Sequence, residues 1–245
     1  MTEEKGNAYV RSRELCLTGI SEKAVAEKLS DLTESIRNPA IRIAPGSLRL
    51  TATGESEEET ELLLSSVERE LRERLGEYIY GTDGATLEAT VLSLLRQRCM
   101  TLSAAESCTG GLVAKRLTDV PGASDCFMGG VTTYTERAKC LLLGIEQSFI
   151  DEHGVVSAAV ADKMARRVRK KLRSHLGIGI TGWAGPGGED VGLVYVALAW
   201  KNSDGNTMSC IRRLNLGDCG REKVRAIAAD NALDMARRYL SGMEI

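Results

Sequence analysis

From residue 86 onward, short apolar stretches alternate with longer amphipathic ones, and this alternation restricts the possible folds more than any other feature. It predicts an α/β domain over residues 85–245, with a layered α/β/α sheet covered by helices on both faces. The predicted strands are 101–106, 127–134, 177–182, 192–200 and 207–214, and the predicted helices are 86–98, 109–119, 135–143, 146–153, 158–176 and 220–241.

Residues 9–80 have a different pattern, which predicts a small α+β domain. Strands are expected at 9–20, 40–44 and 48–54, because apolar and polar residues alternate there. A first helix is expected over 21–36, and turn residues at 80–84 suggest a domain boundary.

The second helix of this small domain is predicted over 57–75. Ser56 and Glu59 form a capping-box pattern at its start. Its expected apolar stripe consists of Leu62, Leu63, Val67 and Leu71. Small domains of this kind occur both as interaction modules and as spacers, and the glutamates of this helix disfavour RNA.

Composition excludes several classes of protein. The formal net charge of -2 argues against a nucleic-acid-binding protein. No apolar run is long enough to cross a bilayer, and the first residues lack the apolar core of a signal peptide. The 7 cysteines include no CxxC pair and there are only 2 histidines, so neither a disulfide framework nor a metal site is indicated. We therefore expect a cytoplasmic protein with reduced thiols.

The segment Glu106-Ser107-Cys108-Thr109-Gly110-Gly111 joins a predicted strand to a predicted helix. The free N–H groups of a first helical turn can stabilise an oxyanion or a phosphate, and the two glycines would let a substrate approach the backbone. An ordinary helix cap would have a similar sequence.

Either Ser107 or Cys108 could be a nucleophile in this turn. A catalytic cysteine normally needs a neighbouring histidine or another cation to form the thiolate. His153 and His175 both stand at predicted helix ends and outside any motif. We therefore favour Ser107, with lysine or tyrosine as its base.

Tyr134 and Lys139 could supply that base. Tyr134 ends a predicted strand, and Lys139 lies about one turn into the next helix. A buried lysine loses its proton readily, and a neighbouring tyrosine could relay it. Taken singly, Lys139 is more typical of a solvated helix position and Tyr134 of a half-buried strand position; only their combination with Ser107 indicates a site.

A glycine-rich loop follows the predicted strand 177–182. It contains Thr181, Gly182 and Gly185, and ends at Gly188. Open α/β sheets bind ligands at the carboxyl ends of their strands, so we interpret this loop as part of a binding site. The alternative is a structural hairpin loop.

Taken together, these segments resemble the C-terminal domain of the CinA family, the competence/damage-inducible proteins that include nicotinamide-nucleotide amidase. The similar stretches are AESCTGGLVAKRLTDVPGAS, FMGGVTTYTERAK, LGIEQSFIDEHGVVSAAVADKMA and ITGWAGPGG, within residues 86–240. Residues 9–80 resemble the KH-like domain that precedes it in that family.

The resemblance implies hydrolysis of nicotinamide mononucleotide, a pyridine nucleotide, to nicotinate mononucleotide and ammonia. It implies a metal-independent Ser107–Tyr134–Lys139 apparatus without a cofactor, and a substrate contact at Thr181. It also implies a homo-oligomer.

The chain departs from the family pattern in two places. TYTE replaces the usual TYSN, so that Glu136 adds a negative charge that would raise the pKa of Lys139. The loop after Gly188 is short and acidic, with Glu189 and Asp190. A silent binding module, an amidase with another substrate and a competence-type interaction protein are the rival interpretations.

Overall fold

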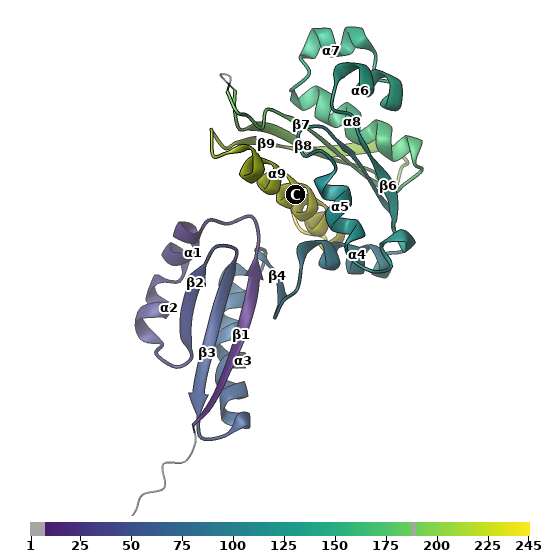
Figure 1. Ribbon diagram of the computed structural model, residues 1–245. Coiled ribbons are helices and arrows are strands. Elements are labelled where there is room, and N and C mark those ends of the chain that lie inside the picture. Colours follow the sequence, from purple (N-terminus) through teal and green to yellow (C-terminus); the bar gives the residue numbers. More distant parts are fainter. Residues whose placement is uncertain (1–7, 188–189) are drawn as a thin grey trace, which may run out of the picture. The chain divides into compact units, whose positions relative to one another are not determined.

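The computed structural model describes residues 8–187 and 190–245, and it divides the chain into two units (Figure 1). The division falls between Thr86 and Leu87. Each unit has its own sheet and its own helices, so each is described by itself.

The first unit is an antiparallel sheet with helices against it. The sheet has the order β2-β3-β1-β4. Its strands are β1 (Tyr9–Leu17), β2 (Ala40–Ala44), β3 (Ser47–Gly54) and β4 (Ile79–Thr82), and its helices are α1 (Glu22–Lys28), α2 (Ser30–Ser35) and α3 (Glu57–Leu75). The predicted α+β arrangement is confirmed.

The capping box of α3 is present, but its apolar stripe differs from the predicted one. Ser56 Oγ accepts a hydrogen bond from the backbone N–H of Glu59 at 3.1 Å. Leu62 is 71% exposed. The buried apolar side chains are Leu64, Val67, Leu71 and Leu75. At 100° per residue Leu62 lies on nearly the opposite side of the helix from Leu64, so assigning it to the stripe was wrong.

Two other details of the first unit differ from the sequence prediction. The expected helix over 21–36 is broken at Leu29 into α1 and α2. The predicted turn at 80–84 is in its first part strand β4, which pairs with β1. A stretch of four residues is too short to show a clear alternating pattern. These residues form a strand because they pair with β1.

The second unit is a sheet of order β6-β5-β7-β8-β9 between two layers of helices. β5, β6 and β7 run parallel, whereas β8 and β9 are antiparallel to their neighbours. The strands are β5 (Leu102–Glu106), β6 (Phe127–Thr132), β7 (Leu176–Gly182), β8 (Leu193–Lys201) and β9 (Thr207–Asn215), and the helices are α4 (Leu87–Gln97), α5 (Leu112–Thr118), η1 (Ala123–Asp125), α6 (Glu136–Leu143), α7 (Gln147–His153), α8 (Ala158–Lys171) and α9 (Arg221–Ser241).

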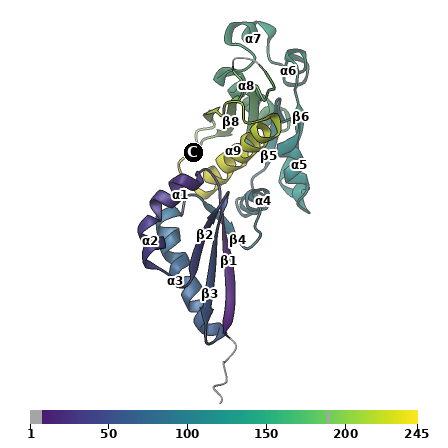
Figure 2. The same ribbon diagram turned by 60° about the vertical axis from the view of Figure 1, so that its left-hand side comes forward.

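The helices cover both faces of this sheet, as predicted. α8, with α6 and α7, packs on one face, and α9, with α4 and α5, packs on the other (Figures 1 and 2). The α/β/α prediction for this part of the chain is therefore confirmed.

Helix α8 approaches β7 unusually closely, because two residues of that strand have no side chain. A Cβ atom at Gly177 would lie 2.3 Å from the carbonyl oxygen of Ala165, and one at Gly179 would lie 2.3 Å from that of Ala161. The absence of a side chain at both positions therefore allows the backbone of α8 to pack directly against the sheet.

The strand directions bring several chain segments to one edge of the sheet. β5 and β7 are parallel and end there at Glu106 and Gly182. β8 and β9 run antiparallel, pairing Gly182 with Val194 and Leu193 with Asn215. The turn after β5, the loop after β7 and the start of α9 consequently meet at this edge.

Candidate active site

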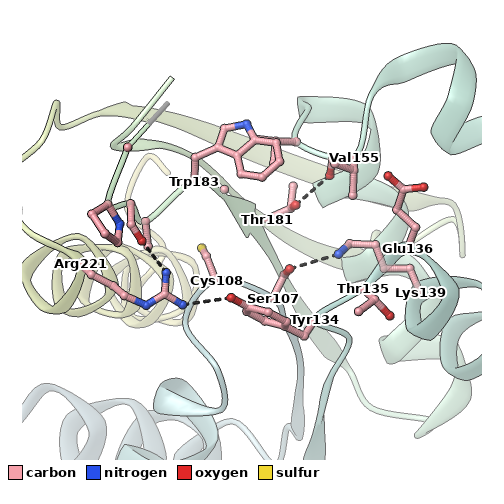
Figure 3. Close-up of a pocket in the computed structure, with 16 residues that line it drawn as sticks. Ser107, Cys108, Tyr134, Thr135, Glu136, Lys139, Val155, Thr181, Trp183 and Arg221 are labelled. Atoms are coloured by element: carbon pink, nitrogen blue, oxygen red, sulfur yellow. Dashed lines mark hydrogen bonds between the residues drawn. The ribbon is translucent and has the colours of Figure 1, made fainter. Parts of the chain in front are cut away.

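A cavity of about 490 Å³ lies at this edge of the second sheet (Figure 3). Its walls come from the turn after β5, from the start of α6, from the segment before α8, from the glycine-rich loop and from α9. The residues discussed below that line it are Ser107, Cys108, Tyr134, Glu136, Lys139, Val155, Thr181, Gly182, Trp183, Gly185 and Arg221.

Ser107 and Lys139 are in direct contact in this cavity. Lys139 Nζ donates to Ser107 Oγ at 3.1 Å and to the carbonyl oxygen of Thr133 at 2.9 Å. The lysine is only 1% exposed and Ser107 is also buried. In the described part of the chain, no carboxylate forms an ion pair with Lys139.

Burial lowers the pKa of Lys139 below its ordinary value of 10.5. The carboxylate of Glu136 acts in the opposite direction, as does Cys108 where its thiol is ionised, but the effect of burial is larger. Glu136 is exposed and its carboxylate accepts a hydrogen bond from Gln147 at 3.1 Å, so water weakens its influence. The predicted direction of the Glu136 effect is confirmed, yet the lysine still loses its proton more easily than a free one.

Glu106 lies behind the cavity wall and holds the turn in shape. Its carboxylate accepts hydrogen bonds from the backbone N–H groups of Val113 at 3.1 Å and Ala114 at 2.9 Å, in the first turn of α5. A carboxylate at a helix N-terminus is favourable because the helix dipole places partial positive charge there. The side chain is buried and does not line the cavity.

Thr109, Gly110 and Gly111 also lie outside the lining residues. Gly110 N–H donates to the carbonyl oxygen of Ser107 at 3.0 Å, and the carbonyl oxygen of Thr109 accepts from Arg225 at 2.8 Å. Gly110 and Gly111 have φ of 63° and 93°, a conformation that glycine adopts without strain. In this structure the three residues shape the turn that presents Ser107.

Cys108 lines the cavity beside Ser107, but its chemistry differs. Burial raises the pKa of its thiol to about 11. A thiol with such a pKa is almost entirely protonated near neutral pH and is a poor nucleophile. Neither histidine lines the cavity.

Tyr134 lines the cavity but is not bonded to the serine–lysine pair. It is 58% exposed, and its hydroxyl accepts a hydrogen bond from Arg221 at 3.1 Å. The same guanidinium donates to the carbonyl oxygen of Gly185 at 2.7 Å. Arg221 thus links Tyr134, two residues after the end of β6, to the glycine-rich loop, as Figure 3 shows.

Thr181 and Gly182 end β7 at the cavity. The hydroxyl of Thr181 donates to the carbonyl oxygen of Val155 at 2.8 Å and is itself buried. Glycine is required at position 182, because a Cβ there would lie 2.7 Å from the carbonyl oxygen of Leu193.

Sequence reasoning missed Arg221 and Trp183 as cavity residues. Arg221 is the first residue of α9, where nothing in the local sequence marks it. Trp183 stands inside the glycine-rich motif, where its large aromatic side chain was a signal that could have identified it. Gly188 and Glu189, where the short acidic loop begins, lie outside the described residues.

Residues 8–187 and 190–245 contain no group of three or more histidine, cysteine, aspartate or glutamate side chains able to hold a metal ion. They also include no helix long and apolar enough to cross a membrane.

The fold and the cavity together define a class: an α/β/α domain that holds a buried lysine against a serine hydroxyl at the carboxyl edge of its sheet. Two family models match the chain, the CinA C-terminal domain over residues 84–240 and the damage-inducible protein CinA KH domain over residues 12–81. The chain therefore belongs to the CinA family, and the predicted resemblance is confirmed.

Curated relatives agree with this assignment. A competence-damage inducible protein of Caldanaerobacter subterraneus is 43% identical over 96% of this chain and 57% of its own length. A CinA-like protein of Desulfovibrio desulfuricans is 41% identical over 99% of this chain and 58% of its own length. The chain thus spans less than two thirds of the length of these relatives.

A solved structure shows the same fold for the second unit. The competence/damage inducible protein CihA from Agrobacterium tumefaciens matches with a TM-score of 0.58 and 34% identity, covering 63% of this chain and 93% of that one.

Proposed function

We propose that this protein is an amidohydrolase that converts nicotinamide mononucleotide to nicotinate mononucleotide and ammonia, with Ser107 as nucleophile. The observation that carries the proposal is the contact between Lys139 Nζ and Ser107 Oγ inside a cavity, with a lysine whose pKa burial lowers. The substrate class comes from membership of the family, within which the sequence resembles the amidases.

The reaction begins with proton transfer inside the buried pair. Neutral Lys139 accepts the proton of Ser107, and the serine oxygen bonds to the carboxamide carbon of the substrate. The protonated lysine then gives this proton to the departing nitrogen, the C–N bond breaks and ammonia leaves. Water attacks the resulting ester with Lys139 again as base, which releases the carboxylate and restores Ser107.

The developing oxyanion needs a hydrogen-bond donor near Ser107. The N–H groups of Gly110, Val113 and Ala114 are already directed to other acceptors. Within this turn only Ser107 and Cys108 line the cavity. We therefore propose that the backbone N–H of Cys108 donates to the oxyanion. The sequence alone indicates only that some N–H group of the first helical turn could do so.

Arg221 is suited to the phosphate of the substrate. Both of its hydrogen-bond partners, Tyr134 and Gly185, are uncharged, so its positive charge is not neutralised by them. Guanidinium groups bind phosphate well because their donors match its geometry. The hydroxyl oxygen of Tyr134 accepts the hydrogen bond from Arg221, so the hydroxyl proton remains available for a hydrogen bond to the substrate.

Thr181 is suited to hold the amide. Its hydroxyl proton is committed to Val155, so its oxygen can accept a hydrogen bond from the amide nitrogen of the substrate. This contact would orient the leaving group toward the serine–lysine pair.

The direct test is ammonia release from nicotinamide mononucleotide by the full chain. Wild-type protein should release ammonia and Ser107→Ala should lose activity by at least about 1,000-fold. Ser203→Ala, in an exposed turn, is the matched control. Full activity of Ser107→Ala would refute the serine role, and calorimetric binding by the wild type without turnover would identify a silent binding module.

A further inference from the structure

Trp183 occupies a position from which its side chain can reach a bound ligand. It follows Thr181 by two residues in an extended segment, so both side chains project on the same side. Its backbone is fixed by two hydrogen bonds to the start of β8: its N–H donates to Leu193 at 2.9 Å, and its carbonyl accepts from Gly192 at 2.8 Å.

The indole of Trp183 has no aromatic partner in the described part of the chain. The ring pairs there are Phe149 with His153 and Trp200 with Tyr239. Trp183 lines the cavity and is 48% exposed. In the view of Figure 3 its indole lies across the cavity from Ser107 and Tyr134. A fixed backbone and an uncovered ring facing a cavity are what an aromatic binding platform requires.

The charges around the cavity favour a ligand ring that is positive. Arg221 stands on one wall, where it would hold an anionic group. Lys139 must be neutral to act as base, and burial favours that state. Glu136 adds a carboxylate to the lining. With Lys139 in its working form and Arg221 holding the anionic group of the ligand, a positively charged ring above Ser107 has no unbalanced cation beside it.

We propose that Trp183 stacks on the pyridinium ring of the substrate and selects the cationic, planar ring over the neutral dihydropyridine. This inference rests on the proposed function. The carboxamide must lie at Ser107, which keeps the attached ring within the part of the cavity that Trp183 faces. Tryptophan is the strongest aromatic partner for a cation, and the contribution of such a contact increases when water is excluded.

Binding to catalytically inactive protein tests this inference without turnover. Calorimetric titrations would compare Ser107→Ala with the double variant Ser107→Ala, Trp183→Ile, using nicotinamide mononucleotide and its dihydropyridine form. We expect the Trp183→Ile change to raise the Kd of the oxidised form about 10-fold and that of the reduced form less than about 3-fold. Trp183→Phe should restore most of the affinity for the oxidised form.

A second measurement reports on Trp183 itself. The protein has 2 tryptophans, and Trp200 packs on Tyr239 with ring centroids 4.9 Å apart. Adding nicotinamide mononucleotide should quench the fluorescence of Ser107→Ala, also after Trp200→Phe, but not after Trp183→Ile. Trp200→Phe is thus the matched control.

The outcomes separate the two proposals. If Ser107→Ala binds nicotinamide mononucleotide with the same Kd whether or not Trp183 is replaced, the stacking role is wrong and the proposed function stands. An equal loss of affinity for both ring forms would overturn the selection of the cationic ring. If neither protein binds and wild type releases no ammonia, the proposed function itself fails, and the stacking role with it.

Discussion

The two units bury polar groups in very different ways. Among the described residues of the first unit, the only buried polar or charged side chain is Thr60, whose hydroxyl donates to Glu57 in its own helix. The second unit buries Ser103, Glu106, Ser107, Thr109, Thr133, Lys139, Ser174, Thr181, Asp234 and Arg237. Burying polar groups is costly unless they are paired, so their concentration in one unit calls for an explanation.

Within the second unit, two buried charged clusters differ in how their charge is balanced. Asp234 accepts hydrogen bonds from Arg237 at 2.7 Å, Arg212 at 2.9 Å and Arg238 at 3.2 Å. Lys139 has only neutral hydrogen-bond acceptors. We expect the first cluster to stabilise the fold around α9 and the second to keep a lysine ready to release its proton. Under the proposed function, an unbalanced buried charge marks the candidate site better than burial alone does.

Replacing Lys139 should have the largest effect on activity. Lys139→Met should lower kcat/KM for ammonia release about 100- to 10,000-fold, because the general base is lost. Stability should fall by no more than about 2 kcal/mol, since methionine has no charge to desolvate but leaves the carbonyl oxygen of Thr133 without its donor. Activity assays and chemical denaturation would check both. Lys115→Met, at an exposed lysine paired with Asp119, is the control; a large loss of stability in Lys139→Met would contradict the comparison.

Replacing Asp234 should affect stability more than activity, in contrast to replacing Lys139. Asp234→Asn leaves buried Arg237 without its counter-charge and should lower the free energy of unfolding by about 3–5 kcal/mol. The same change at Asp230, a half-exposed residue of α9 paired with Arg116, should cost less than about 1 kcal/mol. Thermal and urea unfolding measure the difference, and equal stability of the two variants would show that the Asp234 cluster is not the stabilising one.

The pH dependence of kcat/KM tests which groups set the pKa of Lys139. Because protonated lysine cannot act as base, kcat/KM should rise with pH and level off above the lowered pKa of Lys139. Glu136→Gln removes a charge that raises this pKa, so the rising limb should move to lower pH, by less than about one unit because Glu136 is exposed. A shift to higher pH would be incompatible with this assignment.

Stability has a related pH dependence. The unfolded chain has an ordinary lysine pKa and binds more protons than the folded one between the two pKa values. The contribution of Lys139 to stability should therefore increase as pH rises through that range, and Lys139→Met should abolish this dependence.

The smallest effect is expected at the surface of the first unit. Arg13 donates to Glu68 at 2.7 Å and also pairs with Glu61, but these groups are partly exposed. Arg13→Gln should lower the free energy of unfolding by about 1 kcal/mol or less and leave ammonia release unchanged. A larger loss of stability, measured by urea unfolding, would mean that balanced charge is as important in this unit as around Asp234.

Much of the fold could be predicted, because hydrophobic periodicity is strong in the second unit. The strand before Ser107 and the helix after it follow from local sequence, and so does the end of β7 at Thr181. The small strand β4 could not be predicted, since its hydrogen bonds come from β1.

The site could be predicted only in part. Ser107 is marked by its turn, but the contact with Lys139 depends on how α6 packs, which the sequence alone does not specify. Arg221 reaches the cavity because β8 and β9 return the chain to the edge where β7 ends. The hydroxyl of Tyr134 is hydrogen-bonded to that arginine and not to Lys139. The sequence could not predict this partner, because it does not show that α9 begins at the cavity.

Gly177 and Gly179 influence this site without touching it. They set the separation between α8 and β7, and Val155, which precedes α8, holds the hydroxyl of Thr181 at the end of β7. Any side chain at either glycine would push the helix outward and carry the carbonyl of Val155 away from its partner. In a mutational scan these two positions should therefore tolerate as little change as the reacting residues, although no ligand reaches them. The absence of side chains at Gly177 and Gly179 is therefore one of the conditions for the geometry of the candidate site.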